Sequence, residues 1–142
     1  MLDTDVMVAA LRSDRGASRQ LLLCALDNSL EVLVSVPLMV EYEAVLTRSE
    51  HLNVSGLTVH EVMDILDAFA KIVVPVQLWF LWRPRLKDPA DEMVLETAVN
   101  GSADCLVTFN ERHLAAAARE FGLQVLTPRA AWKEVQRRNE KK

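Results

Sequence analysis

Carboxylates follow apolar stretches repeatedly in this sequence, and this recurrence is its first indication of chemistry. Asp3 and Asp5 belong to an Asp-Thr-Asp triplet that precedes a helix-like apolar run at residues 6–11. In α/β sheets, ligands bind at the carboxyl ends of the strands, which is where this triplet would lie. Asp and Thr also cap helices, so a turn with an N-cap explains the triplet alone equally well. The recurrence of the pattern favours a site.

Four more polar residues are placed to join this triplet. Glu41 lies early in a helix after the second expected strand, and Asn110 and His113 follow a strand that ends near residue 108. Asp91 lies in the first turn of the helix before that strand. Each has an ordinary alternative role, as a solvated helix carboxylate, a capping residue or a surface histidine.

Together, these residues predict a cleft with several carboxylates. Mutual repulsion makes such a cluster costly unless a cation neutralises it. Oxygen donors without clustered Cys or His suit Mg²⁺ or Mn²⁺ better than zinc. A divalent ion held in this way can activate water and stabilise charge on a phosphodiester, so the pattern indicates a nuclease.

The elements that would position these residues alternate between helix and strand. Short apolar, β-branched segments predict strands at 31–35, 72–76, 104–108 and 123–126, with helices between them. Such alternation is typical of a mainly parallel sheet with helices on both faces. We therefore expect one α/β domain over residues 1–142, with a frayed basic tail from about residue 137.

Local signals set several boundaries. Thr58 and Glu61 form a capping-box pattern, Ser18 is the expected cap of the second helix, and Pro75 belongs at a strand edge or end. Gly101 is expected to close the helix that contains Asp91. Residues 49–56 are polar and predict a connection without regular structure.

Composition narrows the functional class. The chain has 142 residues, of which 51% are hydrophobic and 25% charged, as in a globular protein. No apolar run approaches a membrane span and no signal peptide is evident, while Cys24 and Cys105 are typical of core residues in a reducing cytoplasm. The net charge of −4 argues against a general polyanion binder but is compatible with a nuclease whose acids gather at one site.

Two further segments suggest contacts with other molecules. Four basic residues could hold phosphates near the carboxylates. Three lie in the loop before Asp91 and one follows the strand that ends near residue 108; they are Arg83, Arg85, Lys87 and Arg112. Residues 79–82, Trp-Phe-Leu-Trp, are either core or a surface for association. We interpret them as a surface for dimerisation or for a partner protein.

The sequence also resembles a known family over nearly its whole length: the PIN domain, and within it the VapC-like ribonuclease toxins of bacterial toxin–antitoxin modules. The order and spacing of five segments together carry the resemblance. They are Leu-Asp-Thr-Asp-Val at 2–6, Val-Ser-Val-Pro-Leu-Met-Val-Glu-Tyr at 34–42, Asp-Pro-Ala-Asp-Glu-Met-Val-Leu-Glu-Thr-Ala at 88–98, Ala-Asp-Cys-Leu-Val-Thr-Phe-Asn at 103–110, and Leu-Thr-Pro at 126–128.

The resemblance implies a three-layer α/β/α fold and a Mg²⁺- or Mn²⁺-dependent endoribonuclease. Asp3, Glu41 and Asp91 match the family's first three acids, the catalytic and metal-binding positions. Asp5 takes a position more often held by Asn, and Asn110, near the fourth acidic position, supports by hydrogen bonding. The chain departs from the pattern at the fourth acid, because neither Asn110 nor His113 is an Asp.

The resemblance further implies an RNA substrate, a cognate antitoxin, a homodimer or higher oligomer and a cytoplasmic location. Two alternative functions remain open. Asp-x-Asp after a strand also opens the haloacid-dehalogenase phosphatases, with Asp3 as nucleophile, although a later-strand lysine is missing here. A PIN-like module that binds without cutting is the other.

Overall fold

The computed structural model describes residues 1–78 and 89–141. The expected basic residues Arg83, Arg85 and Lys87, the aromatic segment 79–82, and Asp88 therefore lie outside the described residues. The elements in chain order are α1 (Thr4–Arg12), α2 (Ala17–Leu26), β1 (Leu33–Ser35), α3 (Val36–Leu46), α4 (Ser49–Ser55), α5 (Val59–Ile72), β2 (Val74–Val76), α6 (Pro89–Asn100), β3 (Cys105–Val107), α7 (Glu111–Glu120), β4 (Gln124–Leu126) and α8 (Pro128–Glu140).

The strands are short and all of their pairings are parallel, as the sequence predicts. β1 pairs with β2, and β3 pairs with β4. Leu2 forms a parallel bridge to Val107, with the Asp3 amide donating to the Val107 carbonyl at 2.9 Å. The first strand is thus reduced to a bridge, and the sheet that the sequence predicts as one appears as two pairs of strands. Pro75 lies in β2, which pairs on one side only, as expected for a residue without an amide hydrogen.

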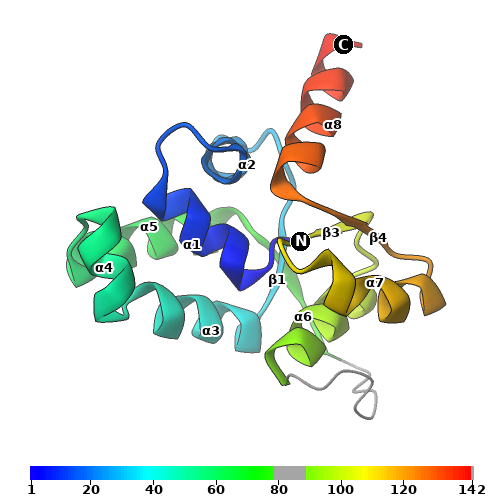
Figure 1. The fold of residues 1–142 in the computed structure, drawn as a ribbon, viewed down its shortest axis with the longest axis horizontal. Coiled ribbons are helices and arrows are strands. Elements are labelled where there is room, and N and C mark those ends of the chain that lie inside the picture. The colour runs from blue at the N-terminus through cyan, green and yellow to red at the C-terminus, as the bar shows by residue number, and fades with distance from the viewer. Residues whose placement is uncertain (79–88, 142) are drawn as a thin grey trace.

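Helices enclose the strands. Figure 1 shows α1, α3, α4 and α5 gathered at one end of the molecule and α6 and α7 at the other, beside the β3–β4 pair. α8 packs on α2 and then extends outward. It runs to Glu140 and so includes part of the segment expected to fray. Among the described helices, none is both long and apolar enough to cross a membrane.

The core joins the amino-terminal residues to the helices around them. Tyr42 and Phe69 are fully buried with ring centroids 6.1 Å apart. The Tyr42 hydroxyl donates a hydrogen bond to the Leu2 carbonyl oxygen. Tyr42 therefore ties α3 directly to the backbone that leads into Asp3, and α5 packs against Tyr42 through Phe69.

Several local expectations are confirmed and others are wrong. The capping box is present, with the Glu61 amide donating to Thr58 Oγ1 at 3.1 Å. Residues 49–55 form α4 rather than an irregular connection; the helix packs on α1, and one partly buried apolar residue, Leu52, gave too weak a periodicity to predict it. α2 begins after Gly16, so Ser18 is a buried residue inside the helix and not its cap.

Gly101 follows α6, as expected, but for a different reason. The left-handed residue at this turn is Ser102, with φ of 51°, whereas Gly101 is needed for close packing. A Cβ at position 101 would lie 2.8 Å from Val76 Cγ2 and 2.9 Å from Leu33 Cδ1. Gly101 thus lets the end of α6 approach the β1–β2 pair.

Candidate active site

A cleft of about 610 Å³ collects the candidate acidic residues from three separate parts of the chain. It is lined by Asp3 and Asp5 of the amino-terminal segment, Glu41 of α3 and Asp91 of α6, with Asn110 also at its wall. The structure therefore brings together all five residues that the sequence predicts as catalytic or supporting. His113 and Arg112 do not line it.

Asp3 is held by hydrogen bonds from two sides. Its Oδ1 accepts from the Thr4 amide at 2.7 Å, which makes Asp3 the N-cap of α1, and its Oδ2 accepts from Thr108 Oγ1 at 2.6 Å. The capping and site roles are therefore compatible. Asp3 is only 6% exposed, and because Thr108 is buried at the end of β3, the bond fixes the carboxylate across the parallel bridge. Thr108 was not predicted as a site residue, because its only signal in the sequence is its place two residues before Asn110.

Asp5 lies beside Asp3 in an electrostatically unfavourable position. Its Oδ2 accepts from the Phe109 amide at 3.2 Å, but its Oδ1 is buried and has no hydrogen-bond partner. Burial, followed by the nearby Asp3 charge, raises the pKa of Asp5 to about 7. Protonation of the Asp5 carboxyl group is thus favoured by its surroundings.

Glu41 reaches the cleft from α3. On α3, the buried residues Leu38, Tyr42 and Val45 form the inward stripe, and Glu41 stands at its edge, half-buried. Ser35 begins this helix, its Oγ accepting from the Leu38 amide. The stripe fixes the rotation of α3 and therefore the side on which Glu41 emerges.

Asp91 lies in the first turn of α6 and is 9% exposed. Its Oδ2 is 4.0 Å from Nδ1 of His113, an exposed side chain on α7. α6 is anchored beneath the site by Thr97, whose Oγ1 is 2.7 Å from Ser35 Oγ. This buried contact ties the helix of Asp91 to the cap of the helix that carries Glu41.

The donor atoms of the cleft suit a hard divalent cation in kind. They are carboxylate oxygens, one of which, Asp5 Oδ1, is buried without a partner. Over the described parts of the chain, no three or more His, Cys, Asp or Glu side chains are arranged as a ready-made metal site. The cleft therefore fits a divalent cation in the type of its donor atoms. The carboxylates line the same cleft, but they are not arranged around a single point.

Among the cleft residues that were not predicted as site residues, two are basic side chains. They are Arg12, at the end of α1, and His51, on α4. Arg12 carried no distinguishing signal within its loop-like surroundings. His51 could not be placed because α4 was not predicted.

Comparison with known families agrees with this architecture. A family model for the PIN domain matches residues 1–112, a range that contains every candidate carboxylate and Asn110. The chain belongs to the PIN domain family. PIN domains are generally nucleases, so this membership indicates a nuclease-type function. Neither the curated proteins nor the solved structures gave a match.

Proposed function

We propose that this protein is a metal-dependent endoribonuclease that hydrolyses phosphodiester bonds in RNA. The observation that supports this most directly is the shared cleft of Asp3, Glu41 and Asp91. Two of the three are nearly fully buried. Burying carboxylates close together costs stability unless they are compensated, so their arrangement favours a role in chemistry.

We further propose Asp3, Glu41 and Asp91 as the ligands of Mg²⁺ or Mn²⁺. When bound, such an ion would activate water and stabilise the negative charge that develops on the phosphate. The chain's own residues would orient the metal ligands. Thr108 and the Thr4 amide fix both oxygens of Asp3.

Asp5 would act beside the metal ligands. The Phe109 amide holds one of its oxygens, which fixes the Asp5 carboxyl group beside Asp3. Asn110 also lines the cleft, and its backbone amide donates to Thr108 Oγ1 at 3.0 Å. We assign both residues supporting roles.

The biological role that we propose is that of a toxin in a toxin–antitoxin module, on the basis of the five-segment sequence resemblance. In that role residues 1–142 would act as one cytoplasmic domain, as a homodimer or higher oligomer that binds a cognate antitoxin. Induced expression should then arrest growth of the host, and Asp91→Asn should relieve the arrest. Arrest of equal strength by both proteins would contradict this role.

The enzymatic proposal is tested by RNA cleavage with purified protein. Cleavage should require Mg²⁺ or Mn²⁺, stop with EDTA, and be abolished by Asp91→Asn. Asp67→Asn, which removes a carboxylate from an exposed position on α5, is the matched control and should cleave normally. In EDTA, Asp91→Asn should be as stable as the wild type or slightly more so, because repulsion is relieved.

Three outcomes would contradict the proposal. Turnover that persists in EDTA, or a phospho-aspartate at Asp3, would favour the phosphatase alternative, which membership in the PIN family otherwise sets aside. Absence of cleavage together with specific RNA binding would favour the non-catalytic module.

A further inference from the structure

A buried pair of hydroxyl groups joins α3 to α6 beneath the cleft. Ser35 and Thr97 are 1% and 0% exposed, and Ser35 Oγ lies 2.7 Å from Thr97 Oγ1 although 62 positions separate the two residues in the chain. Ser35 begins the helix that carries Glu41, and Thr97 lies in the helix that carries Asp91. The pair therefore connects the helices of two of the three proposed metal ligands.

The proton of each hydroxyl in this pair has a defined acceptor. Thr97 Oγ1 donates to the Met93 carbonyl at 2.9 Å, within its own helix, so it must accept at the contact with Ser35. Ser35 Oγ therefore donates to Thr97, and it accepts from the Leu38 amide at 3.4 Å. A continuous chain of hydrogen bonds thus runs from the first turn of α3 into α6 and fixes their contact in direction as well as in distance.

Hydrogen bonding makes this contact closer than apolar side chains allow. Carbon atoms in van der Waals contact lie about 3.5–4.0 Å apart, whereas the two hydroxyl oxygens are 2.7 Å apart. A methyl group in place of the Thr97 hydroxyl would therefore widen the contact between α3 and α6 by roughly 0.8 Å. Since apolar groups of the same shape can replace a buried hydrogen-bonded pair with little effect on stability, packing alone does not require two hydroxyls here.

The hydroxyl pair is placed so that a change in the spacing of the helices reaches the cleft. Glu41 lies six residues after Ser35, and Asp91 lies six residues before Thr97, so each carboxylate is about 9 Å along its helix from the pair. Packed helices transmit such a shift because protein interiors have low compressibility. A wider contact beneath the cleft therefore moves the two carboxylates apart by a similar distance.

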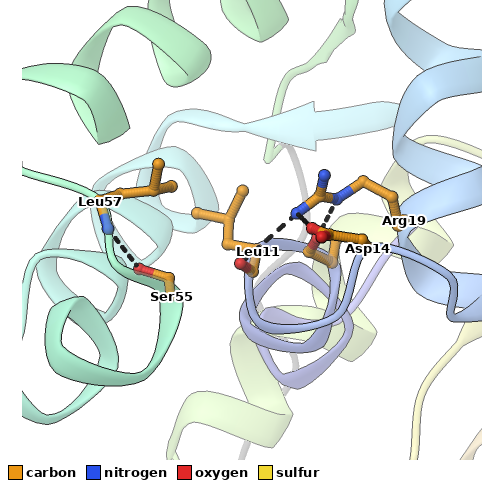
Figure 2. Close-up of polar contacts among 6 residues, drawn as sticks. Leu11, Asp14, Arg19, Ser55 and Leu57 are labelled. Atoms are coloured by element: carbon orange, nitrogen blue, oxygen red, sulfur yellow. Dashed lines mark hydrogen bonds and ion pairs between the residues drawn. The ribbon is translucent and has the colours of Figure 1, made fainter.

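The amino-terminal part of the site is held by other contacts. Asp3 accepts a hydrogen bond from Thr108. Figure 2 shows the far end of α1 held by Arg19 of α2, whose guanidinium lies 3.5 Å from the Leu11 carbonyl and 3.4 Å from the Asp14 carboxylate. These contacts involve neither α3 nor α6, so the spacing of those two helices is set separately.

We propose that Ser35 and Thr97 are positioning residues that set the spacing of Glu41 and Asp91, and that this spacing makes the cleft selective for small divalent cations over larger ones. The inference rests on the proposed nuclease function and its metal ligands. Mg²⁺ requires near-ideal octahedral geometry with oxygen ligands at about 2.0–2.1 Å, whereas Ca²⁺ accepts flexible geometry at about 2.3–2.6 Å. A displacement of roughly 0.8 Å therefore disfavours Mg²⁺ more than Ca²⁺.

The test measures the dissociation constants of Mg²⁺ and Ca²⁺ for the RNA-free protein by titration calorimetry. Thr97→Val removes the hydroxyl with little change of shape. It should weaken Mg²⁺ binding by about 10- to 100-fold, the usual effect of losing a contact that orients metal ligands. Ca²⁺ binding should weaken less, so the ratio of the Mg²⁺ to the Ca²⁺ dissociation constant should rise. Thr97→Ser keeps the hydroxyl and should restore most of the wild-type ratio.

Thr47→Val is the matched control. Thr47 Oγ1 donates to the Glu43 carbonyl at 2.7 Å, the same kind of bond that Thr97 makes within its helix, but Thr47 lies at the far end of α3 and is not among the described residues that line the cleft. Its ratio of dissociation constants should equal that of the wild type.

A second variant, Ser35→Ala, removes the other hydroxyl and should raise the ratio in the same direction as Thr97→Val. Thermal unfolding in EDTA verifies that each variant is folded. Failure of both Ser35→Ala and Thr97→Val to fold would show that the pair serves stability, and it would contradict the positioning role.

The outcomes separate this inference from the function on which it rests. A wild-type protein that neither binds Mg²⁺ nor cleaves RNA would refute the proposed function itself. If the wild type cleaves RNA but binds Mg²⁺ too weakly for calorimetry, the Mg²⁺ concentration for half-maximal cleavage and the inhibition constant of Ca²⁺ supply the same ratio. Given cleavage by the wild type, equal losses of Mg²⁺ and Ca²⁺ affinity in Thr97→Val, or a ratio that Thr97→Ser does not restore, would refute only the positioning role.

Discussion

The carboxyl group of Asp5 should make the protein less stable as the pH rises, and Asp5→Asn should remove this effect. Its pKa is about 7 in the folded protein against an ordinary value of 3.8. Between these two values the folded state binds more protons than the unfolded state, so the free energy of unfolding falls with rising pH and then levels off above about 7. This change of stability with pH is opposite in sign to that caused by a carboxylate that a salt bridge stabilises.

The size of this loss of stability follows from the shift in the pKa of Asp5. About three pKa units at about 1.4 kcal/mol each give roughly 4 kcal/mol in full. Because Asp5 is partly exposed, screening by solvent reduces this to about 2 kcal/mol. About three-fifths of the effect falls between about pH 5 and pH 8, so the wild type should lose about 1.2 kcal/mol more than Asp5→Asn over that interval.

Urea unfolding of both proteins at these two pH values, in EDTA, measures the difference directly. Asp67→Asn serves as the control, because it removes a carboxylate from an exposed helix position and should keep the wild-type pH dependence. Parallel pH profiles for the wild type and Asp5→Asn would show that the crowding of Asp3 and Asp5 does not shift the ionisation of Asp5. A cation would then not be needed to relieve repulsion between Asp3 and Asp5.

Three further substitutions test how the site is held. Thr108→Val should cost about 1.5–3 kcal/mol in urea unfolding and slow cleavage, because it removes a hydrogen bond to a charged group, while Thr108→Ser should retain most of both. Tyr42→Phe should cost about 0.5–1.5 kcal/mol of unfolding free energy through loss of its bond to the Leu2 carbonyl; a wild-type value would mean that this bond is not needed to hold the Leu2 backbone. Gly101→Ala should lower the free energy of unfolding by about 1–3 kcal/mol, because the new methyl group overpacks against Val76 and Leu33. Gly16→Ala is its control: a Cβ there would have its nearest contact 3.2 Å away, at Ser13 Oγ, so the loss should be smaller in the same denaturation measurement.

The sequence determined the fold class and the set of carboxylates at the cleft. Alternating apolar periods and turn signals are local, and they located the strands, most helices and the Thr58–Glu61 capping box. The placement of acids after strands then led to one edge of a parallel sheet, because parallel strands end on the same side. Asp3, Glu41 and Asp91 could therefore be grouped without any structure.

Tertiary structure decided the details that depend on contacts between distant segments. Thr108 holds Asp3 across 105 positions of the chain, and no local pattern marks such a pair. α4 exists because it packs on α1, which is also why His51 reaches the cleft. The same holds for Arg12: only the rotation of α1, set by its buried Val6, Met7 and Ala10, turns Arg12 onto the face that carries Asp5. Helix rotation is fixed by packing, and packing is not local.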